Sequence, residues 1–281
     1  MTTPKVQGDD PRSPYLGFGL RLRRDYVPEV LRLLPDVGWF EIISENYMDA
    51  EPGELRQLDA IRSRYPLTMH GISLSIGSPW PLDTDYLERL KKLLDRVDPA
   101  WVSDHLCWSG ADDNQGRMLP LPYSQDTLEH LVSRIAKVQD YLGRRILLEN
   151  VPVERGRLSQ EIAEAEFLRE VAEQSDSLIL LDISNLHTTC VNQGLELDDY
   201  LRLLPGNRVQ QIHLAGATQL CEPGARSGES VKDPIWDFYG DTLAHFGPVS
   251  TMIERIDCMP SLEEMVGQLH RARRAAGAIA S

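Results

Sequence analysis

The chain has 281 residues, of which 29 are basic and 43 acidic, so its formal net charge is −14. This acidic balance disfavours nucleic acid as a partner, because binding a polyanion requires a basic surface. The four cysteines form no CxxC pair, which disfavours a disulfide scaffold and a thiolate zinc site. The sequence has no apolar run of about 18 residues, so we expect a cytoplasmic protein without membrane or nucleic-acid partners.

Residues 1–14, MTTPKVQGDDPRSP, are polar and contain prolines, and they predict a disordered leader. Residues 15–281 show no repeat and no low-complexity linker. We therefore predict one domain over residues 15–281, a length that α/β barrels reach as a single unit.

Short apolar runs alternate with amphipathic helical patterns, which favours a parallel sheet built from βαβ units. We predict strands at 16–22, 39–44, 67–73, 101–107, 145–151, 178–184, 209–215 and 249–255. Helical patterns are clearest at 86–97, 126–142 and 261–277, the last with a capping box at Ser261 and Glu264 and an end at Gly277. Eight such units predict an α/β fold of the (β/α)8 TIM-barrel type. A doubly wound sheet is the alternative, but GFGLRLRRDY lacks the third glycine of a phosphate-binding turn.

Six of these strands each carry one histidine or carboxylate near their end. The residues are His70, His105, Glu149, Asp182, His213 and Glu254. Barrel closure would bring them within about 10 Å of one another at the C-terminal mouth. As free ions the carboxylates would repel there, and divalent cations remove that conflict. A hydrogen-bonded core residue explains any one of them equally well, and Arg255 could pair with Glu254, but six in succession favour a metal site.

Histidine and carboxylate ligands without cysteine suit Fe(II), Mn(II) or Zn(II). Six ligands are too many for one catalytic ion with an open position, so we predict two ions, with Glu149 as the bridging carboxylate. A second set of residues follows the strand ends and is predicted to orient ligands or bind substrate, although asparagine and serine are also common in turns. This set is Asn46, Asn150, Ser184, Asn185 and His187.

Seven motifs resemble, in family order, the multinuclear non-haem iron-dependent oxidative enzymes (MNIO). They are EIISENYM, MHGISLSIG, SDHLCW, LPLPYSQDTLEHL, LLENV, LDISNLH and IHLAGA, and the resemblance runs from about Gly17 to Gly277. The family includes the methanobactin biosynthesis oxygenase and the enzyme of 3-thiaglutamate biosynthesis. The resemblance implies a xylose-isomerase-like barrel, with the six strand-end residues as iron ligands. It also implies that iron and O2 oxidise a thiol-containing substrate, a ribosomal precursor peptide in natural-product biosynthesis, often with a partner protein that recruits the peptide.

The loop at 214–234 departs from the family. Ala217, Ala225 and Ser227 stand where relatives have His, Asp and His for an additional iron. We therefore expect two irons, and a third site only if Cys221, Glu222 or Glu229 rebuilds it.

Three other functions fit the same residues. The principal alternative is a Mn-, Mg- or Zn-dependent sugar isomerase or epimerase on the same barrel, although such sites commonly include a lysine and no predicted strand end carries one. A zinc phosphodiesterase acting on damaged DNA is disfavoured by the charge of −14. A non-catalytic scaffold that keeps the metal site is the last alternative.

Overall fold

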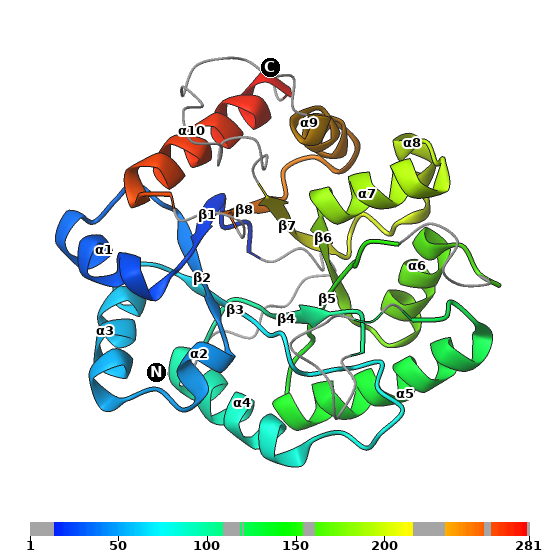
Figure 1. The fold of residues 1–281 in the computed structure, drawn as a ribbon, viewed down its shortest axis with the longest axis horizontal. Helices are drawn as coiled ribbons and strands as arrows, with labels where there is room; N and C mark the ends of the chain where they lie inside the picture. Colours follow the sequence, from blue (N-terminus) through cyan, green and yellow to red (C-terminus); the bar gives the residue numbers. More distant parts are fainter. Residues whose placement is uncertain are drawn as a thin grey trace.

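The computed structural model describes residues 14–108, 119, 121–153, 161–215, 234–255 and 260–279. Within them, eight parallel strands close into a barrel in chain order (Figure 1). The strands are β1 (Phe18–Arg21), β2 (Trp39–Ile43), β3 (Leu67–His70), β4 (Val102–His105), β5 (Leu147–Glu149), β6 (Leu178–Asp182), β7 (Val209–Ala215) and β8 (Ser250–Glu254). Each lies inside its predicted range, so the prediction of a (β/α)8 barrel is confirmed. The predicted leader, apart from Pro14, lies outside the described residues.

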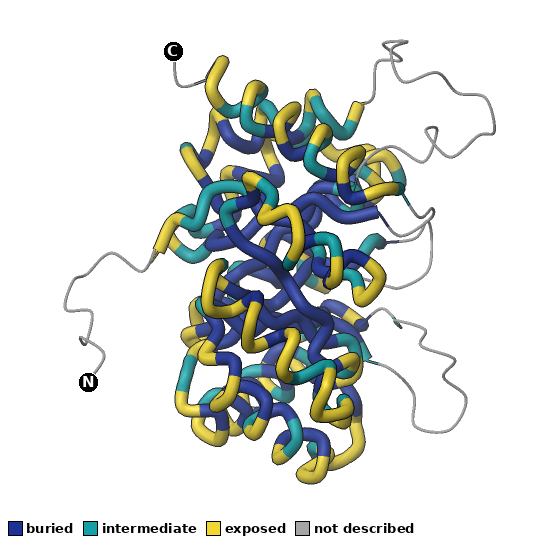
Figure 2. The backbone as a smooth tube through the Cα atoms, turned by 90° about the vertical axis from the view of Figure 1, so that its left-hand side faces the viewer, coloured by how far each residue is buried: buried dark blue, intermediate teal, exposed yellow. Residues whose placement is uncertain are grey.

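Helices surround the barrel, with their exposed faces outward and the buried strands at the centre (Figures 1 and 2). They are η1 (Arg24–Tyr26), α1 (Val27–Leu33), α2 (Glu45–Met48), α3 (Pro52–Arg62), α4 (Thr84–Val97), α5 (Gln125–Leu142), α6 (Glu164–Gln174), α7 (Ile183–Gln193), α8 (Leu197–Leu203), α9 (Pro234–Phe246) and α10 (Leu262–Ile279). Among the described residues, none of these helices has the length and apolar character that crossing a bilayer requires.

Burial on both faces explains why the strands are nearly continuous apolar runs. Every residue of β2, with the sequence WFEII, and of β6, with the sequence LILLD, is buried. Glu41 and Asp182 are the charged exceptions in these two strands. A buried carboxylate is costly unless it has partners, so both residues point to a polar cluster inside the barrel.

The helix ends follow from local hydrogen bonding. Before α10, the backbone N of Ser261 donates to Glu264 at 2.7 Å and the backbone N of Glu264 donates to Ser261 Oγ at 3.2 Å, which confirms the predicted capping box. The predicted end at Gly277 is wrong, because α10 continues to Ile279. Glycine ends a helix when it takes a positive φ, as Gly143 does after α5 with φ of 73°, and Gly277 is not among the residues with positive φ.

A buried carboxyl group lies on the outer wall at the start of α6. The side chain of Glu164 is packed near Tyr200 of α8 and Thr189 of α7, all of them buried. Burial raises the pKa of Glu164 from 4.5 to about 8, against the lowering effect of Tyr200 and Thr189.

We expect Glu164 to make the free energy of unfolding depend on pH. The folded chain binds this proton more tightly than the unfolded chain, so the stabilising effect is complete below pH 4.5 and is lost as the pH rises to about 8. Over this range the free energy of unfolding of the wild type should fall, relative to that of Glu164→Gln, by at most about 1.4 kcal/mol per pH unit. Urea unfolding at several pH values measures this, and comparing the two proteins cancels the titration of other groups.

Glu166 provides the control, because it lies in the same helical turn and is exposed. Glu166→Gln should keep the wild-type pH dependence. Parallel pH profiles for wild type and Glu164→Gln would contradict the prediction.

Candidate metal centre

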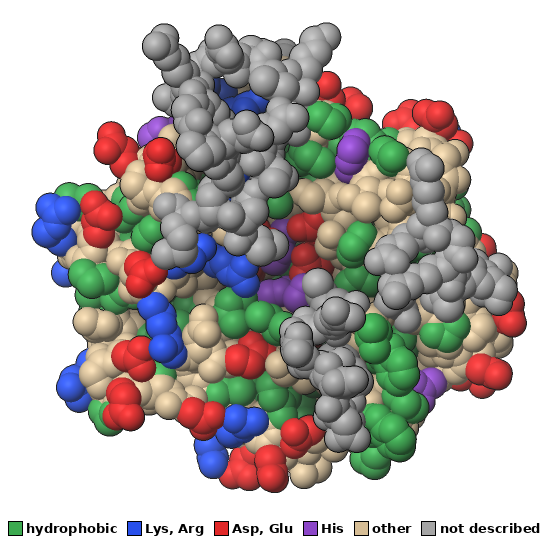
Figure 3. Space-filling model, in the orientation of Figure 1, with side chains coloured by type: hydrophobic (Ala, Val, Ile, Leu, Met, Phe, Trp, Pro, Cys, Tyr) green, Lys and Arg blue, Asp and Glu red, His purple; other side chains and the backbone are tan. Residues whose placement is uncertain are grey.

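All eight strands contribute one charged or histidine side chain to a cluster in the C-terminal part of the barrel. From β1 to β8 these are Arg21, Glu41, His70, His105, Glu149, Asp182, His213 and Glu254, and we name this set the polar ring. Seven of the eight residues are buried, and the Arg21 side chain is partly exposed. Acidic and histidine side chains are visible at the centre of the face shown in Figure 3, with Lys or Arg side chains beside them.

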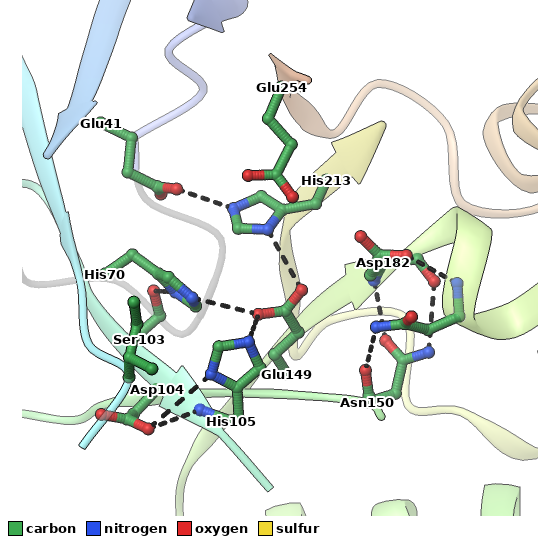
Figure 4. A network of polar contacts seen from close by, with 12 residues as sticks. Glu41, His70, Ser103, Asp104, His105, Glu149, Asn150, Asp182, His213 and Glu254 are labelled. Atoms are coloured by element: carbon green, nitrogen blue, oxygen red, sulfur yellow. Dashed lines mark hydrogen bonds and ion pairs between the residues drawn. The ribbon is translucent and has the colours of Figure 1, made fainter. Parts of the chain in front are cut away.

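Glu149 lies at the centre of the polar ring, between three imidazoles (Figure 4). Its Oε1 is 3.2 Å from His213 Nδ1. Its Oε2 is 3.2 Å from His105 Nε2 and 3.4 Å from His70 Nε2. The two oxygens of this carboxylate therefore face different histidines, as they would if Glu149 bridged two ions held by those histidines.

Three sets of three side chains each bring one ligand atom within 4.8 Å of the others. The sets are Glu41, His70 and His213; His70, His105 and Glu149; and Glu149, Asp182 and His213. Five of the six residues predicted as metal ligands are therefore brought together. Glu254 is not in these sets: its carboxylate lies near His213 in Figure 4 and forms an ion pair of 2.8 Å with Arg21.

Neighbouring side chains on β4 position two of the histidines. Ser103 Oγ is 2.8 Å from His70 Nδ1, so the other ring nitrogen of His70 faces Glu149. Asp104 Oδ1 accepts a hydrogen bond of 2.8 Å from the backbone N of His105 and lies 4.0 Å from His105 Nδ1. A hydrogen bond to the imidazole, such as the one between Ser103 and His70, commonly sets the orientation and tautomer of a metal-binding histidine.

Asp182 ends β6 and caps α7, so one residue serves the helix and the polar ring. Its Oδ1 accepts a hydrogen bond of 2.7 Å from the backbone N of Asn185. The Asn150 side chain accepts from the Asp182 backbone N at 2.7 Å and donates to the Asp182 carbonyl at 3.2 Å. The N-cap of α7 uses only the Oδ1 atom of Asp182, so the other carboxylate oxygen is not required for capping.

The residues predicted to orient ligands or bind substrate lie in different places. Asn150 and Asn185 hold Asp182 as just described. Ser184 is half-buried in the first turn of α7. Asn46 is exposed in α2, and His187 is half-buried and packs against α9.

Two of the four carboxylates of the polar ring resist ionisation, whereas Glu41 and Glu149, despite their burial, have lowered pKa values because the charge of His213 and other nearby groups together outweigh the effect of burial. Burial raises the pKa of Asp182 to about 8, and the charges of Glu149 and Glu254 add to this effect. Burial also raises the pKa of Glu254, although Arg21 opposes it. A divalent cation would remove this penalty, because each carboxylate would then face a counter-charge.

Glu41 was not predicted as part of the site. Its Oε1 is 2.9 Å from His213 Nε2, and its Oε2 accepts hydrogen bonds from Thr68 at 3.0 Å and Gln211 at 2.5 Å. Burial would raise the pKa of Glu41, but the positive charge of His213 lowers it to about 2. The sequence feature that could have identified Glu41 is an acidic residue in the middle of an apolar strand. Arg21 was not predicted either, and the feature that could have identified it is a charged residue at the end of β1.

Several buried atoms of the polar ring have no hydrogen-bond partner among the described residues. They are Glu41 Oε1, Glu149 Oε2 and His105 Nδ1. Buried polar atoms normally find partners, and Glu149 Oε2, which faces the Nε2 atoms of His70 and His105, lies where a bound cation would satisfy it. His105 Nδ1 is on the other side of its ring, toward Asp104, and Glu41 Oε1 is 2.9 Å from His213 Nε2. The donor set contains imidazole and carboxylate without thiolate, which suits Fe, Mn or Zn.

The loop residues considered for an additional iron site lie outside the described residues. They are Ala217, Cys221, Glu222, Ala225, Ser227 and Glu229, within 216–233.

Solved structures of low sequence identity share the fold. A xylose isomerase domain protein from Alicyclobacillus acidocaldarius aligns with a TM-score of 0.61 at 17% identity, covering 94% of this chain and 100% of that chain. D-psicose 3-epimerase with D-fructose aligns with a TM-score of 0.59 at 14% identity, covering 93% and 97%. At these identities the similarity shows that the barrel fold is shared, and it gives no information about the reaction.

Sequence relatives cover nearly the whole chain. The UPF0276 protein Anae109_1558 of Anaeromyxobacter sp. (strain Fw109-5) is 42% identical over 262 residues, which is 92% of each protein. The family model described as RiPP precursor modification enzyme MbnB/TglH/ChrH matches residues 17–277, where RiPP denotes a ribosomally made and modified peptide. This chain therefore belongs to the MbnB/TglH/ChrH family, the MNIO family that the sequence motifs resemble.

Proposed function

We propose that this protein is a di-iron oxidative enzyme that uses O2 to modify a thiol in a ribosomal precursor peptide. The observation that carries the proposal is the polar ring, in which Glu149 lies between three histidines inside a barrel of this family. Family membership supports a precursor peptide as the substrate. The histidine and carboxylate donors support iron as the metal.

The chain offers two adjacent sets of ligands around Glu149. His70, His105 and Glu149 would hold one ion, and Glu149, Asp182 and His213 would hold the other. Iron bound there would supply a site for a substrate thiolate and for electron transfer to O2, which redox-inactive zinc does not supply.

The remaining contacts keep these ligands oriented. Ser103 holds one nitrogen of His70, and Glu41 faces the Nε2 of His213 so that its Nδ1 points at Glu149. The N-cap of α7 fixes Asp182. Preorganisation of this kind means that the ligands do not have to move far when cations bind, which lowers the cost of binding.

We expect protein purified without oxygen to contain iron, and a chelator to lower its melting temperature. Binding to the folded state alone stabilises it by about 2.7 kcal/mol when the free metal is at 100 times its Kd. Glu149→Gln should lose most of the bound iron and most of the shift in melting temperature. Elemental analysis and thermal unfolding with and without Fe(II) measure both quantities.

A surface carboxylate is the matched control for this substitution. Glu88→Gln removes an exposed residue of α4 that pairs with Lys92, and it should leave iron content unchanged. Equal iron content in wild type and Glu149→Gln would contradict the assignment of Glu149 as the bridging ligand. Protein that holds manganese without iron and converts ketoses would favour the sugar isomerase or epimerase alternative, although no lysine lies in the eight described strands.

We expect the iron-loaded protein to consume O2 when a cysteine-containing peptide is present. Mixing anaerobic protein with O2 and peptide, and following O2 with an electrode, measures the reaction, while mass spectrometry detects the modified peptide. The same peptide with serine in place of cysteine is the control, because its hydroxyl is a poor metal ligand at neutral pH. Iron-loaded protein that consumes no O2 with any thiol would count against the proposal.

A further inference from the structure

Arg21 is the only cationic side chain of the polar ring other than the histidines. It ends β1, where its Cα pairs with Glu41 of β2, and the preceding residue, Leu20, pairs with Ile253 of β8. This register places Arg21 between two carboxylate-bearing strands. Its charge also acts inside the site: burial would raise the pKa of Glu149, and Arg21 is among the groups that lower it.

The guanidinium of Arg21 has more donors than its hydrogen bond to Glu254 uses. Its Nη1 donates to Glu254 Oε2 at 2.8 Å. An arginine carries five N–H donors in a planar fork that matches a carboxylate in two places. The Arg21 side chain is 20% exposed and that of Glu254 is 7% exposed, so the arginine is the more accessible member of the pair.

Arg21 is the one arginine or lysine of the polar ring and lies among four buried carboxylates, so an anionic ligand at this position would depend on Arg21 itself. The chain as a whole carries −14, so its average field repels anions and a local basic site is needed to hold one. A second guanidinium lies beside the end of β8, because Arg23 Nη1 is 3.5 Å from the backbone carbonyl oxygen of Arg255. Figure 3 shows Lys or Arg side chains bordering the acidic and histidine groups at the centre of the face.

We propose that Arg21 binds a carboxylate of the substrate that lies close to the reacting thiol. The inference rests on the proposed function, since it places the thiolate on a metal of the polar ring. Two kinds of substrate would present a carboxylate next to a cysteine. The carboxylate would belong either to the end of the peptide chain or to an adjacent acidic side chain. Arg21 is then a specificity-determining residue, and Glu254 keeps its guanidinium aimed at the site.

Cobalt-loaded protein tests this without turnover, because thiolate binding to Co(II) gives a charge-transfer absorption that can be titrated. The probes are N-acetylcysteine and its uncharged amide, which differ only in the carboxylate. N-acetyl-Cys-Asp-amide and N-acetyl-Cys-Asn-amide form a second pair that moves the charge to a side chain. We expect wild type to bind the charged member of at least one pair about 10- to 100-fold more tightly, the range of a charge-assisted hydrogen bond. The pair that shows the preference identifies the source of the carboxylate.

Arg21→Gln should abolish this preference while the neutral probes still bind. Arg21→Lys keeps the charge but loses the fork, and should keep part of the preference, so it tests the idea if Arg21→Gln folds poorly. The control is Arg96→Gln, which removes an exposed arginine paired with Asp59 on the outer helices. It should leave the preference unchanged.

The outcomes separate this inference from the proposed function. Equal affinity of wild type for charged and neutral thiols would overturn the role of Arg21 while leaving thiolate binding intact. A preference as large as that of wild type in either Arg21→Gln or Arg21→Lys would overturn it as well. Absence of the charge-transfer absorption with every thiol would remove the proposed function together with the inference.

Discussion

The cost of burying charge is the constraint on which the rest of the site depends. Eight strands converge on one space, and each brings a charged or histidine side chain into it. An isolated carboxylate there would be very expensive, so every member needs a partner. Glu149 meets this need by facing three imidazoles, and Glu254 meets it through Arg21. Glu149 Oε2 has no hydrogen-bond partner among the described residues, and a cation bound between the histidines would supply one.

The fold meets this constraint by using the same backbone features that end its strands and start its helices. Asp182 is both the last residue of β6 and the N-cap of α7, so the helix start fixes a potential ligand. Ser103 and Asp104, which precede His105 on β4, contact His70 and the His105 backbone. Positions of potential ligands are therefore set by local structure that would form without metal, and a preorganised site binds with less reorganisation.

The sequence predicted the barrel and five clustered residues because both depend on local patterns. Eight apolar runs in alternation with helices define the strand count, and parallel strands must bring their C-terminal ends together. Glu41 was missed because it lies in the middle of β2, where only the alternation of side chains in the closed barrel turns it inward. The pairing of Glu254 with Arg21 was also missed, because β1 and β8 meet only when the barrel closes. The sequence pattern suggests Arg255, the next residue in the chain, as the partner of Glu254.

The barrel by itself leaves the reaction undetermined, since a likeness at 14% and 17% identity shows the fold alone. What distinguishes this chain is the composition of the polar ring: histidines and carboxylates at seven positions and one arginine at the eighth, with no lysine in the described strands. Lysine can lose its proton when buried and then serve as a base, whereas arginine stays charged and offers a rigid fork of donors. A permanent cation beside a cluster of potential metal ligands is suited to holding an anion in place, and it does not itself exchange protons with a substrate.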